Sequence, residues 1–106
     1  MPIPLRIIFR HVDRSPALEA RVRDLAGRLE RFYDRITACR VTVEGPPAHH
    51  SKGGPYSIRI ALAIPGGEIN VNSRSQDGAG HHDVYVALRD AFDGAKRQLV
   101  SVTDRV

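Results

Sequence analysis

Four arginines share one flank of a helix that the sequence predicts over residues 16–33. On a helical wheel they lie along one side of the apolar face, and most of the acids lie along the other side. We call these four residues the arginine stripe: Arg21, Arg28, Arg31 and Arg35. Asp24 is the one acid among them. A guanidinium group offers a fork of donors that matches phosphate oxygens. Because a merely solvated face would mix the two signs of charge, we interpret the stripe as a phosphate-contact surface. The alternative is a solvated face with local ion pairs.

A second predicted helix begins at Asp83, reaches about Leu99 and adds further basic side chains. They are Arg89, Lys96 and Arg97. Asp93 lies four residues from both arginines, a spacing at which helical ion pairs form. These basic residues are therefore candidates for phosphate contacts, with structural ion pairs as the alternative.

A third basic group alternates along the predicted strands, on the side away from their apolar face. It consists of Arg6, Arg10, Arg40, Arg59 and Arg74. An uncovered sheet face needs polar side chains in any case, so solvation is the favoured interpretation there. Tyr56 points to the predicted core by parity, which leaves the outer face without aromatic rings that stack on bases. A platform for single-stranded nucleic acid is therefore disfavoured.

The sequence contains no recognisable catalytic or metal-binding constellation. Its histidines are His11, His49, His50, His81 and His82. Adjacent histidines in glycine-containing segments lack the spacing and rigidity of metal ligands. Cys39, the only cysteine, faces the predicted core, and no serine sits in a nucleophile elbow. We therefore expect no enzyme activity, no cofactor, no metal and no small-molecule substrate.

The composition favours a polyanionic partner. Lysine and arginine together number 16 against 12 acids, for a formal net charge of +4 and a sequence pI near 9.8. The length of 106 residues fits one domain, spanning residues 1–106. With a single cysteine, no signal peptide and no apolar run long enough to cross a membrane, the expected location is the cytoplasm.

Six predicted elements, in the order β-α-β-β-β-α, position these charges. Alternation of apolar and polar residues predicts strands over residues 3–10, 39–44, 56–64 and 68–73, with a hairpin turn at Pro65–Gly67. A strand, a helix and a second strand imply a parallel, right-handed unit. We expect an α+β fold with a four-stranded mixed sheet in the order 1-2-3-4 and both helices on one face. After the first strand, the element order is that of double-stranded-RNA-binding domains (dsRBD-like).

Capping residues and chain breakers mark the limits of the predicted helices and loops. Ser15 provides an N-cap hydroxyl for the first helix and Pro16 suits its first position, while Asp83 is the expected N-cap of the second helix. Gly94 is a misfit in the second helix, costing about 1 kcal/mol against alanine at an exposed position. Residues 45–55 are dense in helix and strand breakers and are predicted to form a mobile loop.

Apolar periodicity also predicts the core. Phe32 in the first helix and Val102 in the second fall on the inward stripes. The residues that we expect to be buried are Ile7, Phe9, Leu25, Leu29, Val41, Ile60, Leu88, Phe92 and Leu99.

Five short motifs occur along the chain, and their order and spacing are more specific than any one of them. They are SPAL at Ser15–Leu18, LE at Leu29–Glu30, GGE at Gly66–Glu68, DVYVA at Asp83–Ala87 and RQL at Arg97–Leu99. Together they resemble the ribosome hibernation-promoting and ribosome-associated inhibitor proteins, also called the sigma-54 modulation protein family, in its short form. The resemblance covers nearly the whole chain.

That resemblance implies a domain that lodges in the mRNA and tRNA channel of the small ribosomal subunit during stationary phase or stress. Such a domain silences translation by occupancy and not by catalysis. Its partners would be the small ribosomal subunit and its rRNA. The sequence shows no counterpart of the C-terminal domain with which long members of the family pair ribosomes.

The resemblance also implies site residues, because the family's main rRNA contacts are basic residues on the two helices. They would here be Arg28, Arg31 and Arg97, with Arg21, Arg35, Arg89 and Lys96 as neighbours. The chain departs from the family in the second helix, where members often carry lysines at the positions of Gly94, Val100 and Ser101.

Other hypotheses compete with ribosome binding. One is a regulatory protein on the same scaffold that acts away from the ribosome, for example on structured RNA through the basic face of the sheet. Another is a metal-dependent enzyme that uses the paired histidines His49, His50, His81 and His82. Independently of these, the first strand or the fourth would be a sheet edge through which weak homo-oligomers form.

Overall fold

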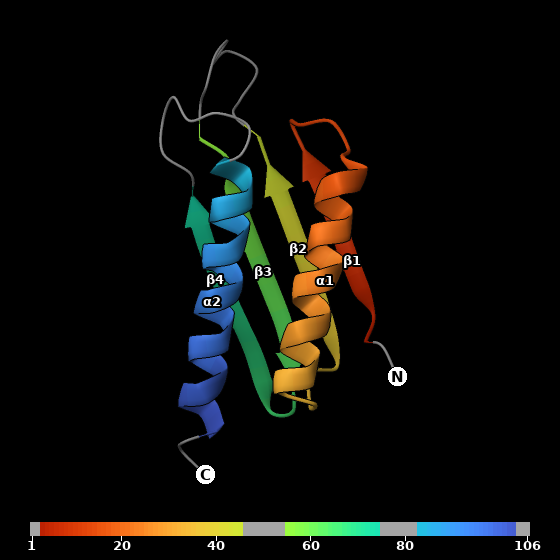
Figure 1. The fold of residues 1–106 in the computed structure, drawn as a ribbon. Coiled ribbons are helices and arrows are strands. Elements are labelled where there is room, and N and C mark those ends of the chain that lie inside the picture. Colours follow the sequence, from red (N-terminus) through yellow and green to blue (C-terminus); the bar gives the residue numbers. More distant parts are fainter. Residues whose placement is uncertain (1–2, 46–54, 75–82, 104–106) are drawn as a thin grey trace.

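Four strands form a single mixed sheet in the spatial order β1-β2-β3-β4, and two helices complete the fold (Figure 1). The computed structural model describes residues 3–45, 55–74 and 83–103. The elements are β1 (Leu5–Arg10), α1 (Pro16–Phe32), β2 (Ala38–Glu44), β3 (Ser57–Ile64), β4 (Gly67–Arg74) and α2 (Asp83–Thr103). The predicted α+β class, element order and strand order are confirmed.

Strand directions follow from the connections between the strands. β1 and β2 are parallel because α1 carries the chain back between them, and their register pairs Arg6 with Arg40. β2 and β3, and then β3 and β4, pair antiparallel. The turn between β3 and β4 consists of Pro65 and Gly66. Gly66 has a φ of +84°, a conformation that glycine adopts without the penalty of a Cβ.

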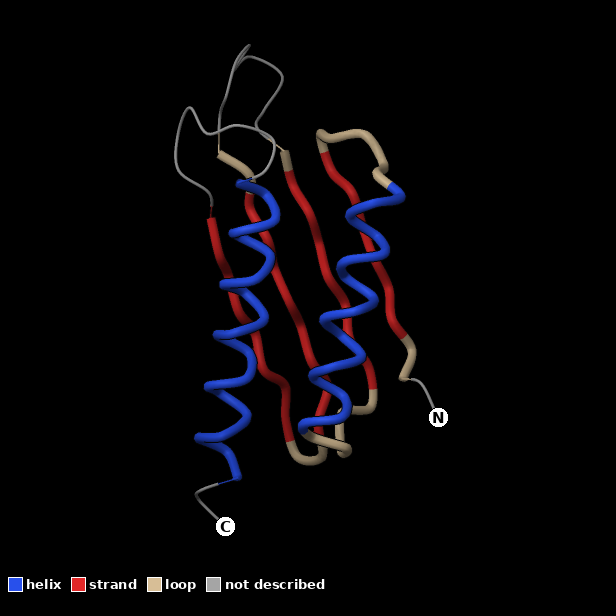
Figure 2. Tube along the Cα trace, viewed as in Figure 1, coloured by secondary structure: helices blue, strands red, loops and turns tan. Residues whose placement is uncertain are grey.

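Both helices lie on one face of the sheet, as predicted (Figure 1). α2 packs on β3 and β4, whereas α1 packs on β1 and against α2. Each helix reverses the direction of the strand before it, so the two helices run parallel to each other (Figure 2). No described residue covers the opposite face of the sheet, which is therefore open to solvent.

The core lies between the two helices and the covered face of the sheet. Alternate residues of β2 and β3 are buried, as expected for strands with one apolar face. No polar or charged residue in the described part of the chain is buried. Burial is confirmed for Leu25, Leu29, Val41, Ile60, Leu88, Phe92 and Leu99.

The start of α1 has the predicted cap. The Leu18 N–H donates to Ser15 Oγ at 3.2 Å, and Pro16 occupies the first helical position. α2 begins at Asp83, as predicted, but the side chain of Asp83 lies outside the described residues. Residues 46–54 of the predicted loop also lie outside them, as do the four paired histidines His49, His50, His81 and His82.

Two residues of β1 are less buried than the sequence predicted. Ile7 and Phe9 are only partly buried against the core. β1 is an edge strand, paired on one side by β2 alone, and α1 covers it incompletely. Alternation correctly gives the face on which these side chains lie, but it does not give the extent of the cover above an edge.

Phe32 and Val102 also depart from the predicted inward stripes, since both are exposed. Phe32 is the last residue of α1 and lines a groove between the helices instead of the core. α2 has 21 residues and is about 31 Å long, whereas the eight residues of β4 span about 26 Å. The last turn of α2, which contains Val102, therefore extends past the sheet (Figure 1).

Gly94 is buried, contrary to the expectation of an exposed misfit. A Cβ at this position would lie 3.1 Å from Val71 Cγ1, so a larger residue would require Val71 to shift by a few tenths of an ångström. One turn further along, Gln98 Nε2 donates to the Asn70 carbonyl oxygen at 3.3 Å. The glycine thus seats α2 on the edge strand β4.

Replacement of Phe92 should test the assignment of the core. Phe92 is 5% exposed, so Phe92→Ala should lower the free energy of unfolding by about 3–5 kcal/mol through lost burial and a residual cavity. Phe32→Ala is the matched control, because Phe32 is 45% exposed and its loss should cost below about 1 kcal/mol. Urea denaturation of both variants measures the difference, and equal losses would contradict the assignment.

Candidate functional site

Two members of the arginine stripe share a single acid on α1. Asp24 Oδ2 lies 3.1 Å from Arg21 Nη1 and 3.2 Å from Arg28 Nη2. The Arg21 and Arg28 side chains are 40% and 62% exposed, so these ion pairs are screened by water and contribute at most about 1 kcal/mol. One carboxylate therefore neutralises part of the charge of two guanidinium groups without burying either.

The other two members of the stripe are placed differently. Arg31 is exposed, and its Nη1 lies 3.7 Å from the point that a Cβ on Gly27 would occupy, on the outer surface of α1. Arg35 is not on the helix, because α1 ends at Phe32 and Arg35 lies in the following turn. The helical wheel extended the α1 spiral three residues beyond the true end of the helix, and this placement of Arg35 was wrong.

A groove of about 210 Å³ runs between the two helices. Apolar side chains from both helices form part of its lining, and charged side chains complete it. Its residues, which we call the helix groove, are Leu25, Arg28, Leu29, Phe32, Phe92, Asp93 and Lys96.

The helix groove brings together basic residues that are far apart in the sequence. Lys96 Nζ lies 4.7 Å from the centroid of the Phe32 ring, a cation–π contact that fixes the ammonium group above the groove. Arg28 borders the same groove from α1. Arg21 and Arg89 do not line the groove; each lies seven residues, about two helical turns, before Arg28 or Lys96 on the same helix.

The other basic candidates on α2, Arg89 and Arg97, do not line the helix groove, and Arg89 has a different ion-pair partner from the one predicted. Arg89 Nη2 lies 3.5 Å from Asp90 Oδ1, and Asp93 makes no ion pair with a described residue. Arg97 Nη2 lies 3.6 Å from the position of a Cβ on Gly94, on the β4 side of α2. The structure therefore brings Arg28 and Lys96 together in the helix groove, places Lys96 and Arg97 on a second pocket along α2, and leaves Arg31 and Arg35 outside both.

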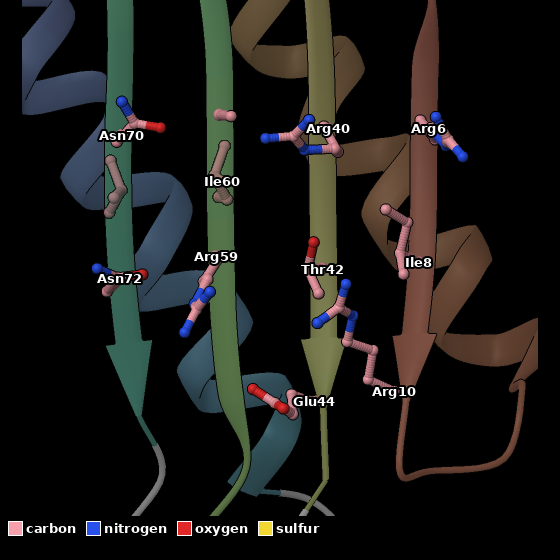
Figure 3. Close-up of a pocket in the computed structure, with 12 residues that line it drawn as sticks. Arg6, Ile8, Arg10, Arg40, Thr42, Glu44, Arg59, Ile60, Asn70 and Asn72 are labelled. Atoms are coloured by element: carbon pink, nitrogen blue, oxygen red, sulfur yellow. The ribbon is translucent and has the colours of Figure 1, made fainter.

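The open face of the sheet carries a second set of basic residues. Its centre is a hollow of about 540 Å³, to which all four strands contribute side chains (Figure 3). The basic residues that line this sheet hollow are Arg6, Arg10, Arg40 and Arg59, all exposed. Alternation predicted this face, although sequence reasoning did not single out Asn70 and Asn72, which line the hollow from β4.

The described residues offer little for catalysis. Burial raises the pKa of the Cys39 thiol to about 11, because the thiolate would lose its hydration, so the group stays protonated at neutral pH. Residues 3–45, 55–74 and 83–103 contain no group of three or more potential metal ligands. Within the same ranges, neither helix is long and apolar enough to cross a membrane.

Comparison with protein-family models identifies the chain. The family described as sigma 54 modulation protein / S30EA ribosomal protein matches residues 5–106. The chain belongs to this family. The family description names a ribosomal protein and a modulator, and no catalytic activity.

Relatives of this S30EA-family chain carry the name ribosome hibernation promoting (or promotion) factor. The protein of Azotobacter vinelandii is 32% identical over 98 residues, which cover 91% of this chain and 78% of the relative. The Escherichia coli K12 protein is 26% identical over 102 residues, which cover 96% of this chain and 95% of the relative. That of Deinococcus radiodurans is 29% identical over 90 residues, and this chain spans only 44% of its length.

Solved structures share the fold. A ribosomal subunit interface protein from Coxiella burnetii superposes with a TM-score of 0.78 at 18% identity, covering 96% of this chain and 99% of that one. The N-terminal domain of Thermus thermophilus Protein Y superposes with a TM-score of 0.68 at 23% identity. The superposition covers 92% of this chain and 94% of that domain. At these identities the likeness establishes the fold of this S30EA-family chain. The kinship with double-stranded-RNA-binding domains stays a prediction from element order.

The thiol of Cys39 should be unreactive in the folded protein. With a pKa of about 11 and a buried sulfur, it should react with a thiol-specific reagent at pH 8 only when the chain unfolds. Ellman's reagent, added with and without denaturant, measures this directly. Stoichiometric reaction of the native protein within seconds would contradict the burial of β2.

Proposed function

We propose that this chain binds the small ribosomal subunit through its rRNA and silences translation by occupying the mRNA and tRNA channel. It acts as a single domain in the cytoplasm, during stationary phase or stress, and performs no catalysis. Family membership and the names of its relatives support this proposal. The observation that carries it is the helix groove, where Arg28 and Lys96 present positive charge from two helices.

The helix groove suits an RNA backbone for physical reasons. Arg28 and Lys96 line the groove and are exposed, while Arg21, with a 40% exposed side chain, and the exposed Arg89 lie about two turns earlier on the same helices. Phosphate groups repeat along RNA, and each phosphate neutralised releases a condensed counterion. Arg31, Arg35 and Arg97 lie outside the groove and extend the basic surface over the outer sides of the two helices and the turn after α1.

Charge reversal in the helix groove should weaken this binding. Arg28→Glu combined with Lys96→Glu places two acids opposite rRNA phosphates, so affinity for purified small subunits should fall at least tenfold, about 1.4 kcal/mol or more. Cosedimentation at physiological salt measures the affinity, and a cell-free extract should show that translation inhibition is relieved.

The matched control is Arg14→Glu with Arg23→Glu, which changes the net charge equally. Arg14 precedes α1 and pairs with Glu19 at 2.8 Å, while Arg23 lies exposed on the flank of α1 away from the groove. If the control variant loses binding as strongly as the groove variant, then net charge and not the groove determines affinity. If neither the wild type nor any variant sediments with subunits but all bind structured RNA, the alternative of an RNA-binding regulator elsewhere takes its place.

Removal of the shared acid should have the opposite effect. Asp24→Asn frees Arg21 and Arg28 from their common carboxylate, so affinity for the small subunit should rise and its dependence on salt should steepen. Stability should change by less than about 1 kcal/mol because the pairs are exposed. Titrations at several salt concentrations report both quantities. A weaker affinity would show that Asp24 positions the arginines for binding and does not compete with RNA.

A further inference from the structure

We propose that the sheet hollow is a second RNA-contact surface, which binds the phosphodiester backbone of an RNA segment separate from the one at the helix groove. The inference rests on the proposed function and extends it from one face of the domain to two. Its occupant is the sugar-phosphate backbone of rRNA, recognised by charge and hydrogen bonding and not by base stacking.

The first observation is the concentration of charge in the hollow. Arg6 and Arg10 come from β1, Arg40 from β2 and Arg59 from β3, and Figure 3 shows all four side chains on the open face. Glu44 is the only acid in the lining. The hollow, which has a volume of about 540 Å³ and is covered by no described element, therefore presents an excess of positive charge.

The second observation is that these charges are left unneutralised. None of the four guanidinium groups makes an ion pair with a described residue, whereas Arg21 and Arg28 on α1 both contact Asp24. Arg6 and Arg40 are moreover register partners on neighbouring strands, whose backbones lie about 4.8 Å apart. Two like charges at adjacent positions repel each other, and a polyanion lying between them removes that repulsion.

The third observation is the chemistry of the other lining residues. Thr42 and Ala61 are small and separate the arginines, which leaves room for a backbone to approach the sheet. Asn70 and Asn72 add amide groups that hydrogen-bond to phosphate or ribose oxygens. No aromatic side chain lines the hollow, so stacking on bases is not its mode of binding.

Solvation alone explains a polar open face, but it does not explain this one. A face that needs only water can carry threonine, serine or mixed charges, and it gains nothing from arginines placed side by side. Because the sheet separates the hollow from the helix groove, the two surfaces face opposite directions. When RNA occupies both the sheet hollow and the helix groove, the domain lies between two RNA segments. Contacts on both sides then hold the domain in place.

Neutralisation of two hollow arginines tests the proposal. Arg40→Gln with Arg59→Gln should weaken binding to small subunits at least tenfold and flatten the salt dependence of log Kd by somewhat over 1 unit. The melting temperature of the same variant should stay unchanged or rise, because the Arg6–Arg40 repulsion is removed. The control is Arg14→Gln with Arg23→Gln, which removes the same number of positive charges. Its affinity for small subunits should be within about twofold of that of the wild type.

A crosslinking measurement gives an independent answer. Because the only native thiol is buried, Asn70→Cys provides a single accessible thiol at the hollow for a photoactivatable crosslinker. In the complex with small subunits, this probe should label rRNA, and a second probe at Arg23→Cys should label it at least fivefold less. Both probes are also mixed with purified, protein-free small-subunit rRNA, so the hollow is tested even without subunit binding.

The outcomes separate the two proposals. If the wild type binds neither subunits nor protein-free rRNA, both proposals fail. If it binds subunits and the helix-groove variant does not, but the hollow variant keeps wild-type affinity and salt dependence, only the second surface is overturned. The second surface is supported if the hollow variant loses affinity and the probe at position 70 labels rRNA. This holds whether the target is the small subunit or protein-free rRNA.

Discussion

Burial of one face of the sheet beneath α1 and α2 is the interaction on which the rest of the structure depends. Val41 in β2, Ile60 in β3 and Leu88 in α2 are each at most 1% exposed, and no polar or charged residue that the structure describes is buried with them. Since apolar area is removed from water only on this face, the charged side chains that the structure describes lie on the helix surfaces, in turns or on the strands away from the core. The two basic surfaces are thus consequences of a one-sided core.

These two surfaces differ in how their charges are balanced. On α1, Asp24 lies within ion-pair distance of two arginines, and on α2 Lys96 is fixed above the ring of Phe32. On the open sheet face, Arg6 and Arg40 are neighbours that make no ion pair with a described residue, although Glu44 and Glu68 line the pockets to which they contribute. An exposed ion pair adds little stability, and an exposed like-charge pair removes little, so stability alone does not select either arrangement. Under the proposed function the two surfaces differ in RNA binding, because a guanidinium group without an internal ion pair neutralises a phosphate, and releases its counterion, without first giving up an acid.

The helices reach these positions through close packing at α2. Gly94 lets α2 approach Val71, and the Gln98 amide then donates to the Asn70 carbonyl oxygen on the edge strand β4. At this position the glycine allows a close contact between helix and sheet. Positive charge on α2 is concentrated at Arg89, Lys96 and Arg97.

Much of the fold was predictable because it rests on local periodicity. Alternation gave the four strands and their outward arginines, and the 3.6-residue period gave Leu25, Leu29 and Leu88 as core residues. Ser15 and Pro16 marked the start of α1 through cap chemistry that depends on neighbouring residues alone. The parallel pairing of β1 with β2 followed from the handedness of a single crossover.

The sequence by itself therefore determined the elements, the faces of those elements and the excess of positive charge, all of which depend on residues close together in the chain. Only the tertiary structure decided that Arg28 and Lys96 share a groove, that Arg6 lies beside Arg40, and that Ile7 is partly open at the sheet edge. These relations depend on strand register and on the packing of α1 against α2. Both are set by contacts between distant segments, which periodicity within one segment does not encode.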